Sequence, residues 1–108
     1  ILASPVRDTM KRGDDGFIQQ TIERENLWHA LTPQMYPTAQ LKNSIEQALS
    51  AQATITDEAS AIEFSGEQSQ LISSSSENIK ITHPDDLALA EFILNKQSTT
   101  DNNIQVTQ

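Results

Sequence analysis

The side chains that could do chemistry are a histidine, two pairs of adjacent acids and two of the basic residues. His29 could act as a base, although a lone histidine in a short apolar run is more often structural. The pairs Asp57-Glu58 and Asp85-Asp86 could bind a metal ion, but acids of this kind are also favoured in the first turn of a helix. We therefore expect no metal ligands among them.

The two cations of interest, among seven basic residues, are Arg24 and Lys80. Lys80 lies in an alternating segment in which Ile79 and Ile81 share one face and the lysine points to the other. In a sheet covered on both faces, such a lysine lies near an edge, extends its stem to water or points into a polar cleft. Arg24 follows a polar segment and could be a solvated surface charge. Residue type alone leaves both an anion-binding role and a surface role open.

Several common enzyme signatures are absent from the chain. There is no glycine-rich phosphate loop, no H-E-x-x-H and no G-x-S-x-G. The absence of cysteine excludes a disulfide scaffold, a thiolate zinc site and a cysteine nucleophile. A formal net charge of -8 argues against nucleic-acid binding, which needs a basic surface. An anionic substrate must therefore be held by a few placed cations.

The elements that would position these groups begin with a polar hairpin. Residues 6–23 form an irregular polar segment, and Gly13–Gly16 supplies turn residues in its middle. The flanks of this turn carry too few apolar residues to make a hydrophobic face. We therefore expect a β-arm that lies on another surface.

Short apolar runs beyond the arm predict strands. Leu27–Leu31 is typical of a buried strand stopped by Thr32-Pro33, and residues 70–73 and 78–82 are expected to be further strands. Helical patterns separate these runs, so the sequence predicts an α/β fold.

Three helices are expected. The first follows Pro37, the second is capped by Thr56 and ends near Gly66, and the third begins at Pro84. Their inward positions are predicted to be Leu41, Ile45, Ala48, Leu49, Ala59, Ile62, Leu87, Ala90, Ile93 and Leu94.

The domain boundaries follow from composition. Residues 1–96 are expected to form part of a single domain, and the polar residues 97–108 a disordered tail. The apolar start at Ile1 indicates a piece of a longer protein. No run approaches the ~18 apolar residues of a membrane span, and no signal peptide is recognisable, so we expect a cytoplasmic protein that binds no membrane.

Four segments in register resemble the 2-C-methyl-D-erythritol 4-phosphate cytidylyltransferases, enzymes of non-mevalonate isoprenoid synthesis. The segments are Pro5–Thr9, Arg24–Gln34, Thr56–Ala59 and Asn78–Leu87. The resemblance covers residues 1 to about 95. It implies the C-terminal half of a Rossmann-like nucleotidyltransferase sheet, with a protruding β-arm that embraces the second subunit of a homodimer.

The resemblance also implies roles for particular residues. Thr9 and Arg24 would contact methylerythritol phosphate bound to the partner subunit, while Thr32, Thr56 and Lys80 would belong to the site on their own subunit. Arg24 and Lys80 would be the catalytic cations. CTP is the implied second substrate, with Mg²⁺ bound mainly by its phosphates and by the N-terminal half. Without that half, this chain is expected to be inactive by itself.

Two alternatives remain open at this point. The first is a cytidylyltransferase for another polyol phosphate, such as ribitol phosphate, which would share the fold and the CTP chemistry. The second is a non-catalytic fragment that serves dimerisation through the arm.

Overall fold

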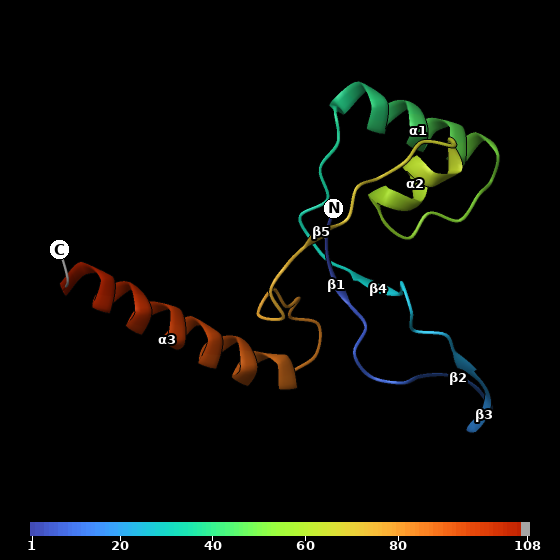
Figure 1. Ribbon diagram of the computed structural model, residues 1–108. Coiled ribbons are helices and arrows are strands. Elements are labelled where there is room, and N and C mark those ends of the chain that lie inside the picture. Colours follow the sequence, from blue (N-terminus) through green and yellow to red (C-terminus); the bar gives the residue numbers. More distant parts are fainter. Residues whose placement is uncertain (107–108) are drawn as a thin grey trace. The chain divides into compact units, whose positions relative to one another are not determined.

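The computed structural model describes the backbone of residues 1–106 and the side chains of residues 1–100. The chain divides into two compact units, Ile1–Ser75 and Ser76–Gln108. The first unit contains five strands and two helices in the order β1-β2-β3-β4-α1-α2-β5, and the second contains helix α3 (Figure 1). The mixture of sheet and helix confirms the predicted α/β class.

A three-stranded sheet forms the centre of the first unit. Its middle strand, β1 (Leu2–Pro5), pairs antiparallel with β4 (Trp28–Ala30) and parallel with β5 (Ile72–Ser73). Ala3 lies opposite a residue of each neighbouring strand and is fully buried. The strand predicted over residues 27–31 is therefore present, but only Trp28 of β4 is even partly buried.

The predicted arm is a two-stranded hairpin of β2 (Met10–Asp14) and β3 (Phe17–Ile22). Asp15 and Gly16 connect the strands with φ of 51° and 81°, the left-handed conformations of a two-residue turn that matches strand twist. Within the described chain, β2 and β3 contact each other and no other strand or helix. Phe17 and Ile18 are 78% and 68% exposed. The arm consequently has no hydrophobic support from the other described elements of its own chain.

Helices α1 (Thr38–Ser50) and α2 (Glu58–Phe64) pack side by side (Figure 1). Ala48 of α1 and Ile62 of α2 are fully buried. Leu49, which was predicted to face inward, is 63% exposed. Successive helical residues are about 100° apart, so a helix that buries Ala48 turns Leu49 away from the same contact.

The cap of α2 is Asp57, and the prediction of Thr56 was wrong by one residue. Asp57 has an extended backbone, and its Oδ1 accepts a hydrogen bond from the Ser60 N–H at 2.8 Å. The Ser60 hydroxyl in turn accepts the Asp57 N–H at 3.2 Å, which completes a reciprocal capping arrangement. Thr56 thus stands one position before the helix cap.

The strand predicted over residues 78–82 is absent from the second unit. Alternation of side chains indicates a strand, but a strand also needs a partner for its backbone ladder. Within the described chain, no strand pairs with this segment, and it forms a loop between Ser76 and α3.

Helix α3 (Asp85–Val106) is longer than predicted. Its residues 97–106 were predicted to be disordered, whereas a helix already nucleated extends at low cost even through polar residues. The rest of that predicted tail, residues 107–108, lies outside the described residues. Ile93 is buried, but Leu87 and Leu94, which were also expected on its inner stripe, are 59% and 62% exposed.

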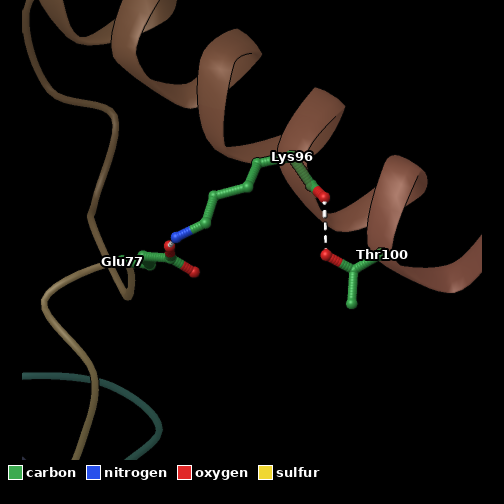
Figure 2. Close-up of polar contacts among 3 residues, drawn as sticks. All are labelled: Glu77, Lys96 and Thr100. Atoms are coloured by element: carbon green, nitrogen blue, oxygen red, sulfur yellow. Dashed lines mark hydrogen bonds and ion pairs between the residues drawn. The ribbon is translucent and has the colours of Figure 1, made fainter. Parts of the chain in front are cut away.

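An ion pair fastens the loop before α3 to the helix. Lys96 Nζ contacts the Glu77 carboxylate, and the Thr100 hydroxyl donates a hydrogen bond to the Lys96 carbonyl at 3.0 Å (Figure 2).

Over the described residues, no helix has the length and apolar character needed to cross a membrane.

Candidate functional site

The first part of the candidate site is a junction between the loop after β4 and the start of α2. Gln34 Nε2 donates hydrogen bonds to the Leu31 carbonyl at 3.3 Å and to Asp57 Oδ2 at 3.0 Å. Its Oε1 accepts the Ala59 N–H at 3.0 Å. One half-buried side chain therefore joins two segments that lie 25 residues apart.

Thr32 and Thr56 flank this junction, one on each segment. Thr32 is exposed and precedes Pro33 across a cis peptide bond. Thr56 is also exposed, and its N–H donates to the Ser60 hydroxyl at 3.0 Å. The structure thus brings together the segments that carry these two predicted site residues.

The second part lies at the base of the arm. Arg24 is exposed, and its Nη1 donates a hydrogen bond to the Arg7 carbonyl. This bond joins the segment that enters the hairpin to the segment that leaves it. Thr9 is exposed two residues beyond Arg7. The backbone bond from Val6 N–H to the Leu27 carbonyl, at 2.9 Å, closes the same base. Thr9 and Arg24 therefore both lie at the base of the arm.

The second unit carries a further predicted site residue, Lys80, in the loop before α3. Lys80 is exposed, and its carbonyl accepts the Thr82 hydroxyl at 3.4 Å. Asp86 Oδ2 accepts the N–H groups of Thr82 and His83, each at 2.9 Å. These bonds from His83 and Thr82 lower the pKa of Asp86, because they favour the ionised carboxylate. The start of α3 thereby fixes the turn that follows Lys80.

The other chemical candidates lie at helix N-termini or in a strand. Glu58 lies in the first turn of α2, and Asp85 and Asp86 in the first turn of α3, as their spacing predicted. His29 is an exposed residue of β4 paired with Ser4 of β1. Among the residues whose positions are described, no group of three or more His, Cys, Asp or Glu could hold a metal ion.

Asp57 is the one cap whose charge is tied to the junction described above. The hydrogen bond from the Gln34 side chain is the main cause that lowers the pKa of Asp57 below 3.8, and the bonds from Ser60 act in the same direction. Partial burial opposes them. The native fold therefore stabilises the ionised carboxylate of Asp57.

This preference predicts a pH-dependent contribution to stability. Because the folded pKa is lowered, the contribution of Asp57 is fully present above pH 3.8 and is lost as the pH falls through the folded pKa. Asp57→Ala should lower the free energy of unfolding by about 1 kcal/mol at pH 7, since it removes the cap. Asp57→Asn keeps a capping oxygen, and its deficit relative to wild type should shrink below pH 3.8.

Chemical denaturation at pH 7 and at several pH values below 4 measures these differences. Glu58→Gln is the matched control, because Glu58 is the neighbouring exposed acid. A deficit for Asp57→Asn that stays constant with falling pH would contradict the assignment.

Gln34 is the residue of this junction that the sequence did not single out. Nothing in its type or local spacing distinguishes it from the other glutamines of the chain, because its partners are set by packing between distant segments. The available signal was only its place at the end of the segment Arg24–Gln34.

Comparison with known proteins identifies a family that this chain matches. The sequence model of the family 2-C-methyl-D-erythritol 4-phosphate cytidylyltransferase matches residues 1–96. The protein of that description from Colwellia psychrerythraea is 62% identical over 111 residues, covering 94% of this chain and 46% of its own length. The Pectobacterium atrosepticum protein is 59% identical over 96 residues, covering 89% of this chain and 40% of its own.

Solved structures agree with the sequence relatives. The crystal structure of the Francisella tularensis 2-C-methyl-D-erythritol 4-phosphate cytidylyltransferase superposes with a TM-score of 0.81 at 37% identity, over 86% of this chain and 44% of that one. A 4-diphosphocytidyl-2C-methyl-D-erythritol synthase gives 0.77 at 40% identity, over 87% and 42%. The chain spans less than half the length of these relatives, and it belongs to the 2-C-methyl-D-erythritol 4-phosphate cytidylyltransferase family.

Proposed function

We propose that this chain is the C-terminal part of an enzyme that transfers CMP from CTP to 2-C-methyl-D-erythritol 4-phosphate in non-mevalonate isoprenoid biosynthesis. A phosphate oxygen of the alcohol phosphate bonds to the α-phosphorus of CTP, and the bond from that phosphorus to pyrophosphate breaks. The products are CDP-methylerythritol and pyrophosphate. The observation that carries the proposal is the family match over residues 1–96.

The remainder of the nucleotide site is assigned to the part of the enzyme outside this chain. The open side of the sheet supports this assignment, since β5 is an edge strand. Ile72 in β5 is 52% exposed, and Leu71 just before it is 45% exposed. The pairing of β5 with β1 is parallel, and parallel strands are ordinarily buried on both faces of their sheet. We propose that the N-terminal half supplies those strands and most of the contacts to CTP.

The proposed chemistry explains why the two principal site residues are cations. Both reactants are anions, so their approach requires neutralisation of charge and alignment of the attacking oxygen. Arg24 offers a planar fork to the substrate phosphate, and Lys80 offers a compact charge beside the reacting groups. Thr9, Thr32 and Thr56 would supply hydroxyl contacts to substrate.

Mg²⁺ is the proposed cofactor, and the residues described here do not by themselves make a site for it. No cluster of three acids or histidines lies among those residues. We propose that the phosphates of CTP and the N-terminal half hold Mg²⁺, and we assign no step to ligands from this chain.

The proposed enzyme is a cytoplasmic homodimer whose arms exchange. Two observations support the exchange: the arm contacts no other element of the described chain, and Phe17 and Ile18 near its tip are largely exposed. An arm laid on a second subunit would bury these side chains and would carry Thr9 and Arg24 to the neighbouring site.

The test is a pyrophosphate-release assay of the complete enzyme with CTP, Mg²⁺ and either methylerythritol phosphate or ribitol phosphate. We expect turnover with methylerythritol phosphate and a clear preference for it. The isolated chain should bind CTP very weakly in titration calorimetry, because it has no glycine-rich loop to cradle phosphates. A preference for ribitol phosphate, or micromolar CTP affinity in the isolated chain, would overturn the corresponding part of the proposal.

A further inference from the structure

The Gln34 side chain joins the loop that carries Thr32 to the N-terminus of α2. It makes three hydrogen bonds, to the Leu31 carbonyl, Asp57 Oδ2 and the Ala59 N–H. The first partner immediately precedes Thr32, and the second immediately follows Thr56. The side chain thus reaches the immediate neighbour of each threonine.

The chemistry of these contacts is specific to an amide. The –NH₂ end donates to two oxygens, while the carbonyl end accepts a helix N–H. Only the amide of glutamine or asparagine offers two N–H donors on one nitrogen together with a carbonyl acceptor. A carboxylate at this position would lack the donors and would repel Asp57. Asp57 Oδ1 is already engaged by the Ser60 N–H, so Gln34 complements the cap rather than competing with it.

We propose that Gln34 is a positioning residue that holds Thr32 and Thr56 in register for the same substrate. The inference rests on the proposed function and deepens it, because it names the group that fixes the relative placement of two proposed substrate contacts. Gln34 acts through the segments that it joins and needs no contact with substrate itself.

The experiment compares Gln34→Met with Gln47→Met in the complete enzyme. Methionine keeps the length of the side chain and removes all three hydrogen bonds. Displacement of substrate-binding groups by about 1 Å costs on the order of a hundredfold, so kcat/KM of Gln34→Met should fall roughly tenfold to a hundredfold. Gln47 is exposed on α1 and forms no side-chain hydrogen bond in the described structure, so Gln47→Met should retain wild-type kcat/KM.

A rescue experiment separates positioning from a general loss of stability. Gln34→Glu should be impaired by repulsion from Asp57, and Asp57→Asn in the same protein restores a donor opposite that carboxylate. The double variant Gln34→Glu/Asp57→Asn should therefore recover several-fold in kcat/KM over Gln34→Glu, because Asn also caps α2. This pair also keeps the proposal testable where Gln34→Met folds poorly.

Hydrogen exchange at the Ala59 amide supplies a readout independent of activity. Exchange should accelerate in Gln34→Met and stay at the wild-type rate in Gln47→Met. Suppose that the wild-type enzyme is active. Unchanged kcat/KM in Gln34→Met, or no rescue in the double variant, would then overturn the positioning role alone. A wild-type enzyme that transfers no CMP to methylerythritol phosphate overturns the proposed function as well.

Discussion

Replacing either Arg24 or Lys80 by methionine is expected to lower turnover of the complete enzyme by about a hundredfold. The substitution keeps most of the aliphatic stem and removes the charge that would offset repulsion between two anionic reactants. Loss of one preorganised electrostatic contact typically costs ~3 kcal/mol of transition-state stabilisation. Both side chains are exposed, so the melting temperature should change little. Steady-state kinetics with saturating CTP and methylerythritol phosphate measures the effect.

Two further variants sharpen this expectation. Lys42→Met removes an exposed cation of α1 and should leave turnover unchanged. Arg24→Lys keeps the charge but loses the planar fork, including the geometry of the bond to the Arg7 carbonyl, and should give an intermediate rate. Wild-type turnover in either methionine variant would remove that residue from the proposed catalytic machinery.

Mixing the impaired Arg24→Met and Lys80→Met proteins is expected to restore activity, up to about half the wild-type value per heterodimer. If the arms exchange, Arg24 of one subunit and Lys80 of the other serve the same site. A heterodimer then has one site with both cations and one site with neither. Turnover measured after subunit exchange, at known heterodimer content, gives the recovery.

The control for this experiment is a Lys80→Met protein from which residues 8–23 have been deleted. Such a subunit cannot deliver an arm, so mixing it with Arg24→Met should restore nothing. The deletion in an otherwise wild-type enzyme should weaken both dimerisation and activity. Absence of recovery between the two point variants, despite confirmed subunit exchange, would place both cations in one subunit's site and exclude the arm-exchange mechanism.

Local sequence determined the elements whose causes lie within a few residues. Asp15 and Gly16 tolerate the positive φ of the hairpin turn, so the arm and its boundaries could be predicted. The i, i+4 pattern through Leu41 and Ile45 located α1. Family membership could also be recognised, because four short segments kept their order and spacing over residues 1–96.

Tertiary structure decided which faces and segments have partners. Residues 78–82 alternate as a strand does, yet they form a loop because a backbone ladder requires a second strand at the right place. Leu49 and Leu94 fit helical periodicity, but the contact that buries Ala48 or Ile93 determines which side of each helix is covered.

For the candidate site, too, sequence and tertiary structure supply different information. Resemblance by short segments indicated Thr9, Arg24, Thr32, Thr56 and Lys80 as residues, without showing what holds any of them. Gln34 meets Asp57 and Ala59 only because the chain returns over more than 20 residues to pack α2 beside the loop after β4. Sequence patterns report interactions between near neighbours in the chain, whereas a junction of this kind exists only after distant segments have packed.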